Sequence, residues 1–400
     1  IGPIVPKVGG SSGGRVQEIS LEVSDEELER ISRERLLALS LKEMRAIQRY
    51  LRDPEVVASR IKVGLGDRVT DVELEAIAQT WSEHCKHKIF NAFIRYVDEE
   101  AGAEERITGL FDTYIRRSTE EIRRRWGERD ICLSVFVDNA GVVAFNDRWS
   151  LTFKVETHNT PSALDPYGGA LTGIVGVNRD PFGTGKGAKL IFNTDVFCFA
   201  PPHWEGELPP RILHPRRILE GVREGVEHGG NKSGIPTVNG CMVFDDRYLA
   251  RPLVFCGTVG LLPKRMSQRG QQKPGDLVIL VGGRTGRDGI HGVTFASGEL
   301  KKESEVVSSS SVQIGNPIME KKTTDAILKA RDQGLFCRIT DCGGGGLSSA
   351  VGEMAAETGV RVYLEKVPLK YSGLSYTEIW VSESQERMVL AVPPDKVDRL

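Results

Sequence analysis

The spacing of apolar residues changes along this chain, and each change predicts a different kind of structure. From Leu28 to Trp81, apolar residues recur every three or four positions, which is the spacing of one face of an amphipathic helix. Capping boxes, in which a hydroxyl and a later carboxylate satisfy free backbone amides, mark the starts of these helices. They are Ser24–Glu27, Ser40–Glu43 and Thr70–Glu73. We therefore predict helices here and a further helical segment to about residue 125.

Beyond residue 131 the pattern shifts to short runs that alternate apolar and polar residues, as half-buried strands do. We predict strands at 131–137, 141–145, 150–156, 171–177, 189–200 and 253–262, and one helix at about 215–228. After residue 274, strands and helices alternate. The predicted strands there are 277–281, 337–340, 360–367 and 388–392, and the predicted helices are 321–333 and 348–357.

These changes of pattern predict an α+β fold in four parts. Residues 1–20 open with a glycine- and serine-rich stretch and are expected to be a flexible linker. Residues 21–130 are predicted to be a mainly helical domain, residues 131–265 a β-rich domain, and residues 266–400 a mixed α/β domain. Because the chain starts with Ile1 and a new helix begins just before Leu400, we expect a fragment whose last domain is incomplete.

Charge and cysteine content narrow the class of protein. Lysine and arginine number 53 and acidic residues 55, for a net charge of −2, so no global field draws the chain to nucleic acid or to an anionic membrane. Its partners are expected to be small molecules or other proteins. The seven cysteines are scattered without metal-ligand spacing, which fits a reducing cytoplasm better than a disulfide framework. No apolar run approaches the roughly 18 residues of a spanning helix.

Polar groups of several kinds gather at the end of the predicted strand 150–156. Lys154, Glu156 and His158 point to one side of an extended chain, while Val155 and Thr157 point to the other. A cation for phosphate, a carboxylate for a divalent metal and an imidazole for proton transfer would then share one face. A solvated strand face is the simpler alternative. A second cation and carboxylate at 179–180, after the next predicted strand, favour a site.

Other segments carry weaker signals. His84 lies near the apolar stripe of the third helix and is equally explained as a core histidine or a functional one. Its neighbour Cys85 diverges by about 100 degrees on a helix, so we predict a buried cysteine and no nucleophile-base pair. Asp341 precedes four glycines, where it could hold a metal beside a phosphate or simply start a helix. The glycine-rich loops 183–187, 282–289 and 343–346 could each bind phosphate, but each signal alone is weak, and the first lacks the spacing of a dinucleotide fingerprint. Residues 225–233 resemble a P-loop but lack its glycine-lysine junction.

Four motifs, in this order and spacing, resemble one enzyme family. The motifs are Ser82–Cys85, Lys154–Asn159, Gly286–Gly292 and Glu383–Arg387. Together they resemble phosphoribosylformylglycinamidine synthase, an enzyme of purine biosynthesis. The resemblance implies an ATP-dependent carbon-nitrogen ligase of the superfamily that includes aminoimidazole ribonucleotide (AIR) synthetase and selenophosphate synthetase. It makes the domains at 131–265 and 266–400 the N- and C-terminal halves of an AIR-synthetase-like module behind a helical linker domain.

The resemblance also implies roles for individual residues. Motif by motif, it implies catalytic roles for His84 and His158, the latter as proton acceptor, and ATP contacts at Lys154 and His87. It implies magnesium ligands at Glu156, Asp180 and Asp341. The implied contacts to formylglycinamide ribonucleotide are Thr157, His158, Asn159, Thr160, Arg179, Gln313, Glu383, Ser384 and Gln385. Two positions depart from the family pattern, because Thr160 replaces a second histidine and His87 stands where a tyrosine is common.

The family's chemistry implies what this chain would work with. Phosphate passes from ATP to the amide oxygen of formylglycinamide ribonucleotide, and ammonia then displaces it. The ammonia would come from a glutaminase subunit or domain, and a small accessory subunit is a possible further partner. Two alternatives stay open from the sequence: a related AIR-synthetase-like enzyme with a different acceptor, and a catalytically silent nucleotide-binding fragment. Magnesium and ATP are expected for a phosphoribosylformylglycinamidine synthase and for the related AIR-synthetase-like enzyme.

Overall fold

The N-terminal part is a small helical domain. The computed structural model describes residues 16–290, 313 and 315–400. The first helices are α1 Asp25–Glu34, α2 Leu41–Leu51, α3 Pro54–Lys62, α4 Asp71–Thr80 and α5 Glu83–Lys86, and a two-stranded ladder joins β1 Glu18–Ile19 to β2 Val69–Thr70. Leu28, Met44 and Leu74 are buried together in the core of this domain. The predicted boxes at Ser40 and Thr70 cap α2 and α4, so the apolar stripe and its start signals were interpreted correctly.

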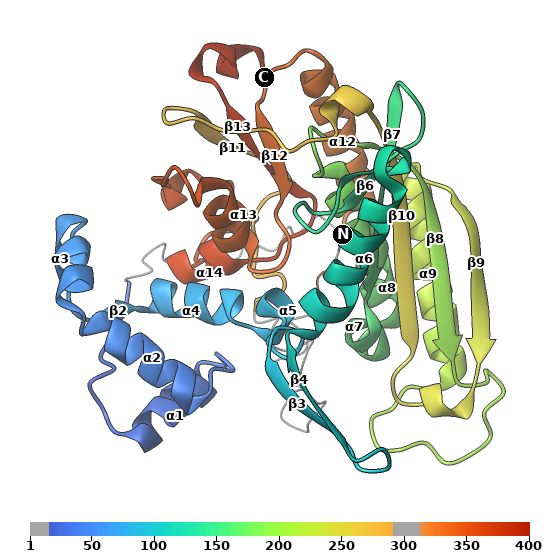
Figure 1. Cartoon of the computed structure of the whole chain (residues 1–400), viewed down its shortest axis with the longest axis horizontal. Coiled ribbons are helices and arrows are strands. Elements are labelled where there is room, and N and C mark those ends of the chain that lie inside the picture. Colours follow the sequence, from blue (N-terminus) through green and yellow to red (C-terminus); the bar gives the residue numbers. More distant parts are fainter. Residues whose placement is uncertain (1–15, 291–312, 314) are drawn as a thin grey trace, which may run out of the picture.

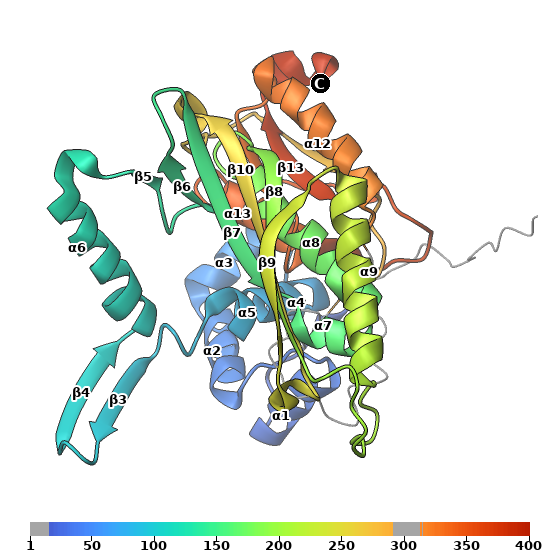
Figure 2. The same cartoon turned by 90° about the vertical axis from the view of Figure 1, so that its right-hand side faces the viewer.

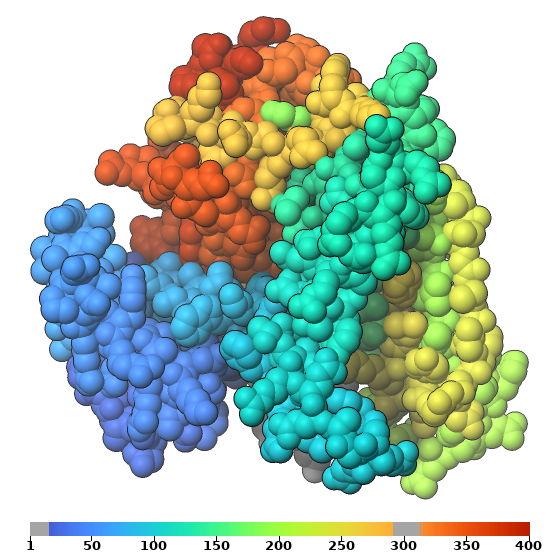
Figure 3. Space-filling view, in the orientation of Figure 1, coloured from blue at the N-terminus to red at the C-terminus, as the bar shows by residue number. Residues whose placement is uncertain are grey.

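A hairpin and a helix stand away from the body of the molecule. The hairpin is formed by β3 Phe93–Asp98 and β4 Ala103–Thr108, and α6 Arg117–Trp126 follows it. Figure 2 shows both projecting from the side that faces the viewer in Figure 1, and in the space-filling view α6 lies across the front of the molecule (Figure 3). The predicted helical segment to about residue 125 was wrong for the hairpin, whereas α6 is helical as expected. Aromatic and β-branched residues from Phe93 to Val97 favour strands.

The central part is a six-stranded sheet in the order β5-β6-β7-β10-β8-β9. Its strands are β5 Cys132–Ser134, β6 Gly141–Ala144, β7 Trp149–Thr157, β8 Lys189–Phe199, β9 Thr237–Phe244 and β10 Leu253–Pro263. Neighbours run antiparallel except β8 and β9, which are parallel. Helices α8 Pro166–Phe182 and α9 Pro215–Ser233 cover one face of the sheet, as Figure 2 shows. Strand β7 therefore has a fixed neighbour on each side, and its last residues are held in place.

The predicted strand 171–177 is wrong, because these residues lie inside α8. Asp165 caps this helix, accepting a hydrogen bond from the amide of Gly168. Ala170, Ile174 and Val177 then recur at helical spacing and pack into the core. The glycines of the segment, which suggested a strand between turns, allow close helix packing: a Cβ on Gly169 would lie 2.5 Å from the backbone nitrogen of Ser162 in the neighbouring α7 Asn159–Leu164.

The C-terminal part packs helices against a three-stranded antiparallel sheet in the order β11-β13-β12. The strands are β11 Leu277–Gly282, β12 Arg338–Asp341 and β13 Arg387–Val392, and the helices are α12 Pro317–Asp332, α13 Gly346–Ala355 and α14 Tyr376–Val381. The predicted strand 360–367 is wrong: this segment is irregular with one 3-10 turn, Leu364–Lys366. Every residue of β13 is buried. No helix among the described residues is both long and apolar enough to cross a membrane.

Candidate active site

A cleft of about 640 Å³ opens where the three parts of the molecule meet. Its walls come from α5, the end of β7, α7, α8, the end of β12, and the loop between β12 and α13. Of the predicted site residues, it is lined by His84, His87, Lys154, Glu156, Thr157, His158, Asn159, Thr160, Arg179, Asp180, Gln313, Asp341 and Glu383. Ser384 and Gln385 lie behind this surface. Positions separated by up to 299 residues in the chain, from His84 to Glu383, are thus brought to one cavity.

The end of β7 carries a charged cluster. The Nζ atom of Lys154 lies 2.8 Å from a carboxylate oxygen of Asp180 and 3.1 Å from one of Glu156. It also donates to the backbone carbonyl of Asn139 at 3.3 Å. Burial opposes the charged form of Lys154, but the carboxylates outweigh it and raise the pKa of the ammonium. Lys154 is therefore cationic at neutral pH and neutralises part of the acidic wall.

The negative charges of Asp180 and Asp341 are not fully balanced by cations among the described residues. Burial and the neighbouring Asp341 raise the pKa of Asp180 to about 7, and burial also raises the pKa of Asp341. Asp341 accepts one hydrogen bond from the Nδ2 of Asn139 at 2.9 Å. No three ligands among the described residues are already gathered around one point. Even so, the donor set fits a magnesium ion, since Mg²⁺ binds through one or two carboxylates plus water and phosphate oxygens.

His158 begins the turn out of β7, and its ring orientation is set by the backbone. Its Nδ1–H donates to the carbonyl of Gly169, which leaves Nε2 as the nitrogen that can accept a proton. Burial lowers the pKa of His158 to about 4, so the imidazole is neutral at physiological pH. Thr157, predicted to point away from this face, lines the cleft as well. The strict alternation ends there because β7 ends at Thr157 and the chain turns into α7.

The two residues after His158 are held differently. The Asn159 side chain accepts from the backbone amide of Val254 at 2.7 Å, which ties α7 to the start of β10. Thr160 is 1% exposed, and its hydroxyl has no hydrogen-bond partner among the described residues. A buried hydroxyl without a partner is costly, so its presence on a cleft wall is compatible with a ligand contact.

The histidine segment is not the end of a long helix. Helix α4 stops at Thr80, and Ser82 caps the separate short helix α5. This break turns His84 to the cleft, where it is exposed, so the core-histidine alternative does not hold. Desolvation by the surrounding walls lowers the pKa of His84. Cys85 is also exposed, and the prediction that it is buried was wrong for the same reason.

His87 completes this wall. It ends α5 in the left-handed region at a φ of 51°, a conformation that few residues other than glycine adopt. Its side chain is exposed and lines the cleft. The backbone geometry of α5 therefore delivers both His84 and His87 to the same cavity.

Arg179 links the cleft to the C-terminal part. It lies on α8, not after a strand as predicted, and is 5% exposed. One terminal nitrogen donates to the Oε1 of Gln385, and Nε lies 3.9 Å from a carboxylate oxygen of Asp341. A nearly buried arginine with so few partners has donors left with which it can bind a further anion.

The segment from Glu383 to Gln385 is buried, although five polar residues in a row usually mark an exposed turn. Glu383 accepts from the amide of Gly345 at 3.1 Å and from the side chain of Gln313. Burial raises the pKa of Glu383 to about 7. Gln385 donates to Gln313 in turn, so this segment orients residues that reach the cleft.

Ser384 connects the same segment to a glycine-rich loop. Its hydroxyl donates to Asp288 and accepts from the amide of Gly286 at 2.8 Å. Of the motif that begins at Gly286, His291 and Gly292 lie outside the described residues. Among the described parts of the three predicted phosphate loops, only Gly343 and Gly344 line the cleft.

Sequence patterns missed several cleft residues: Thr80, Asn139, Thr172, Arg251, Ser349 and Glu353. Asn139 sits in a loop between strands and gave no signal beyond its type. Thr172 was assigned to a strand, although its hydroxyl donates to the backbone carbonyl of Gln313 at 2.7 Å. Arg251 precedes β10 by two residues and has no ion-pair or hydrogen-bond partner among the described residues. A cation just before a strand that pairs with β7 is the one signal that could have drawn attention to it.

Comparison with known protein families agrees with this architecture. The formylglycinamide ribonucleotide amidotransferase linker domain matches residues 28–88, the N-terminal domain of AIR synthase related proteins matches 137–262, and their C-terminal domain matches 273–400. The fold and the cleft thus define an AIR-synthase-related module behind a helical linker domain. The predicted α+β fold and its arrangement are confirmed.

Individual relatives narrow the family. The chain is 38% identical over 383 residues to phosphoribosylformylglycinamidine synthase subunit PurL of Thermoplasma acidophilum, which covers 95% of this chain and 45% of that protein. It is 42% identical over 264 residues to PurL of Methanothermobacter marburgensis, covering 65% of this chain and 36% of that protein. The chain belongs to the phosphoribosylformylglycinamidine synthase family, as a PurL-type chain, and the resemblance noted from its motifs is confirmed.

Solved structures of relatives superimpose on most of this chain. Thermotoga maritima PurL complexed with FGAR matches with a TM-score of 0.65 and 33% identity, covering 88% of this chain and 49% of that one. The same protein complexed with ATP matches with a TM-score of 0.59 and 31% identity, covering 88% and 47%. A PurLQS structure from Thermotoga maritima matches with a TM-score of 0.61 and 30% identity, over 88% and 47%. The chain spans about half the length of these PurL chains.

Proposed function

We propose that this chain forms one ATP-dependent site of a phosphoribosylformylglycinamidine synthase, which converts formylglycinamide ribonucleotide to formylglycinamidine ribonucleotide with ammonia. The cleft that collects the predicted residues is the observation that supports this most, because it combines a cationic lysine, uncompensated carboxylates and a neutral histidine. The Thermotoga maritima PurL complexes with FGAR and with ATP support both ligands.

In this proposal the two ligands occupy different parts of the cleft. Lys154 and His87 contact ATP, with Lys154 placing positive charge beside the transferred phosphate. Glu156, Asp180 and Asp341 would hold magnesium, which would offset the negative charge of the phosphates. Formylglycinamide ribonucleotide contacts the wall made by Thr157, His158, Asn159, Thr160, Arg179, Gln313, Glu383, Ser384 and Gln385.

Two histidines, His158 and His84, are the proposed catalytic residues. The Nδ1–H of His158 is bonded to the Gly169 carbonyl, so its Nε2 accepts the proton released as ammonia attacks the activated carbon. A pKa of about 4 makes His158 a weak base in the empty cleft, but a phosphorylated intermediate nearby would favour the imidazolium. His84, which is exposed and lines the same cleft, is the second catalytic residue.

Arg251 adds a cation that sequence reasoning missed. It precedes Val254, whose backbone is bonded to both His158 and Asn159, and therefore lies close to the proposed ribonucleotide wall. Lys154 is engaged by two carboxylates, and Arg179 by Gln385 and Asp341. Arg251, which has no described partner, is the cation that remains for the phosphate monoester of the ribonucleotide.

The partners follow from the same proposal. Ammonia reaches the cleft from a glutaminase subunit or domain, and a small accessory subunit is a further proposed partner; the PurLQS structure of Thermotoga maritima supports association with other subunits. The setting is the cytoplasm, where purine nucleotides are made. The four domains at 1–20, 21–130, 131–265 and 266–400 remain our proposed division of the chain.

The test is phosphate release from ATP by the natively expressed protein, with magnesium, formylglycinamide ribonucleotide and ammonium. We expect release that depends on both the ribonucleotide and ammonium, and a loss of roughly 100-fold or more in His158→Ala. Calorimetry must show that the variant still binds both ligands. Ammonium-dependent release at the wild-type rate in that variant would remove the role assigned to His158, and release without the ribonucleotide would remove the proposed substrate.

A further inference from the structure

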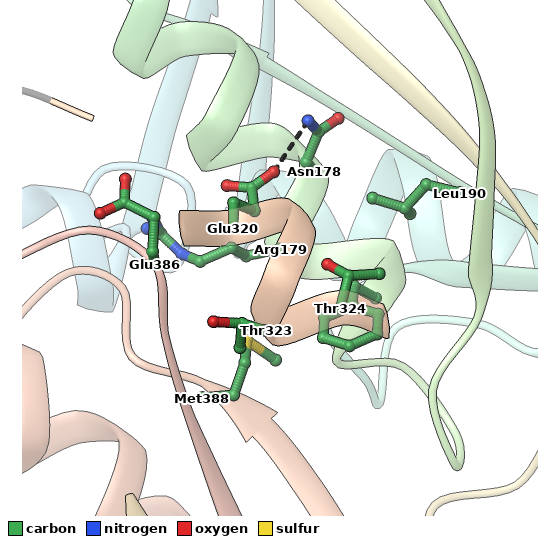
Figure 4. A pocket seen from close by; sticks show the side chains of 9 residues that line it. Asn178, Arg179, Leu190, Glu320, Thr323, Thr324, Glu386 and Met388 are labelled. Atoms are coloured by element: carbon green, nitrogen blue, oxygen red, sulfur yellow. Dashed lines mark hydrogen bonds between the residues drawn. The ribbon is translucent and has the colours of Figure 1, made fainter. Parts of the chain in front are cut away.

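Glu320 is a buried acid at the seam between the C-terminal part and the central sheet domain. It lies on α12, is 5% exposed, and faces α8 across a small cavity whose lining includes Asn178, Arg179 and Glu386. Figure 4 shows these side chains converging from α8, α12 and the start of β13. Burying a carboxyl group costs free energy unless hydrogen bonds compensate it, so the partners of Glu320 need to be identified.

One oxygen of Glu320 is satisfied, and a chain of hydrogen bonds fixes which one. Asn193 and Thr258 both donate to the Oδ1 atom of Asn178, at 3.0 and 2.7 Å. The amide of Asn178 cannot flip without losing both bonds, so its Nδ2 must face Glu320. It donates to the Oε1 atom of Glu320 at 3.0 Å. The position of Oε1 is therefore set by the sheet domain, and only Oε2 is free to bind something else.

The free oxygen and a free nitrogen of Arg179 lie on the same cavity. Neither Oε2 of Glu320 nor Nε of Arg179 has a hydrogen-bond partner among the described residues. The side chain of Arg179 passes between Glu320 and Glu386 in Figure 4. Burial raises the pKa of Glu320 to about 8, and the positive charge of Arg179 opposes that rise. One buried oxygen and one buried N–H group thus belong to residues that line the same cavity of about 10 Å³, which has room for about one water molecule.

Asp341 is the other acid near this nitrogen, at 3.9 Å. The proposed function makes Asp341 a magnesium ligand, and a carboxylate that binds a metal has less charge to offer an arginine. Glu320 would then be the remaining acid that can accept a hydrogen bond from Nε of Arg179, while Gln385 accepts one from a terminal nitrogen.

We propose that Glu320 is a positioning residue for Arg179: its free oxygen Oε2 accepts from Nε of Arg179 through one water in the cavity that both residues line, and this link aims the guanidinium at the ribonucleotide. This rests on the proposed function, which makes Arg179 a ribonucleotide contact. Because Glu320 belongs to α12 and Arg179 to α8, the contact also couples the C-terminal part to substrate binding in the central one.

The decisive variant is Glu320→Gln. Its amide oxygen takes the place of Oε1 opposite Asn178, so its NH2 group, which can only donate, replaces the oxygen that accepts on the Arg179 side. We expect the Kd for formylglycinamide ribonucleotide to rise roughly tenfold, the worth of one lost charge-assisted hydrogen bond. The Kd for a non-hydrolysable magnesium-nucleotide should stay within about twofold. Thr324→Val, on the same helix and lining the same cavity, is the matched control and should change neither Kd.

A double-mutant cycle separates positioning from general packing. In the background of Arg179→Ala, which itself weakens ribonucleotide binding, Glu320→Gln should cause no further loss. Additive losses, an unchanged ribonucleotide Kd in Glu320→Gln, or an equal rise in both Kd values would each overturn the inference. Should wild-type protein fail to bind the ribonucleotide, the proposed function falls and this inference with it. Should Arg179→Ala weaken ribonucleotide binding while Glu320→Gln does not, the proposed function stands and only the inference on Glu320 falls.

Discussion

The two polar walls of the cleft are built in opposite ways. The wall at the end of β7 is open: Glu156 and Thr157 are exposed, and Lys154 pairs with acids that also face the cavity. The wall behind it, from Ser382 to Arg387, is just as polar but wholly buried. In the first wall side chains can exchange partners when a ligand arrives. In the second they are fixed by internal hydrogen bonds, so this wall sets where the ligand-facing groups stand.

The largest effect should come from breaking the buried wall at Arg387. Its guanidinium is fully buried and donates to the Ser384 carbonyl at 2.8 Å, the Thr285 hydroxyl at 2.9 Å and the Ser382 carbonyl. Arg387→Met leaves these acceptors without a donor. It should therefore lower the free energy of unfolding, measured by denaturant titration, by about 3–5 kcal/mol. Arg124→Met on α6, which is exposed, serves as the control and should change nothing measurable. Equal unfolding midpoints for the two variants would contradict a fixed wall.

Breaking the open wall should cost function rather than stability. Lys154→Met removes the cation between Asp180 and Glu156, so a triphosphate would meet unscreened carboxylates. We expect ATP-dependent phosphate release to fall roughly 100-fold, with partial recovery in Lys154→Arg. Unfolding should shift far less than in Arg387→Met. A variant with normal release would mean that the nucleotide does not lie at this wall.

The pH dependence of stability distinguishes the walls further. The pKa of Glu383 is about 7 in the fold, above the value of an exposed glutamate, so the folded state binds the extra proton between roughly pH 4.5 and 7. Stability contributed by this group is therefore lost as the pH rises through that window. Glu383→Gln should flatten the slope by up to about 1.4 kcal/mol per pH unit. The measurement is denaturant unfolding at several pH values, with the exposed Glu365→Gln as control.

The smallest effect is expected at Thr160, on the helix α7 that follows β7. Its buried hydroxyl has no described partner, so Thr160→Val should leave stability unchanged or raise it by up to about 1 kcal/mol. If the hydroxyl contacts the ribonucleotide, the KM for that substrate should rise a few-fold while the KM for ATP does not. A clear loss of stability in thermal unfolding would show that the hydroxyl has an internal partner.

The contrast between the walls also explains what the sequence could predict. Strand β7 was predicted nearly to the residue because its alternating pattern is local, and the charges that follow it stood out against that pattern. The helix α8 was missed because its glycines serve close packing that no local pattern shows: a Cβ on Gly169 would meet the backbone of α7, and one on Gly173 would meet Cys256 on β10. The local pattern at Glu383, five polar residues in a row, is typical of an exposed turn and does not show its burial, because its partners Gln313 and Gly345 lie far along the chain.

The resemblance to a family supplied roles that the patterns alone did not. Local spacing placed Lys154, Glu156 and His158 together, whereas only the family motifs joined them to Gln313 and Glu383. Neither route indicated Glu320 or Arg251, because their significance lies in which partners they have or lack in space.

The most direct test of the central claim is a crystal structure of the protein with magnesium and a non-hydrolysable ATP analogue. The account predicts the triphosphate beside Lys154, with magnesium bound by oxygens of Glu156, Asp180 and Asp341. A triphosphate bound elsewhere, with these side chains still paired only to one another, would contradict it.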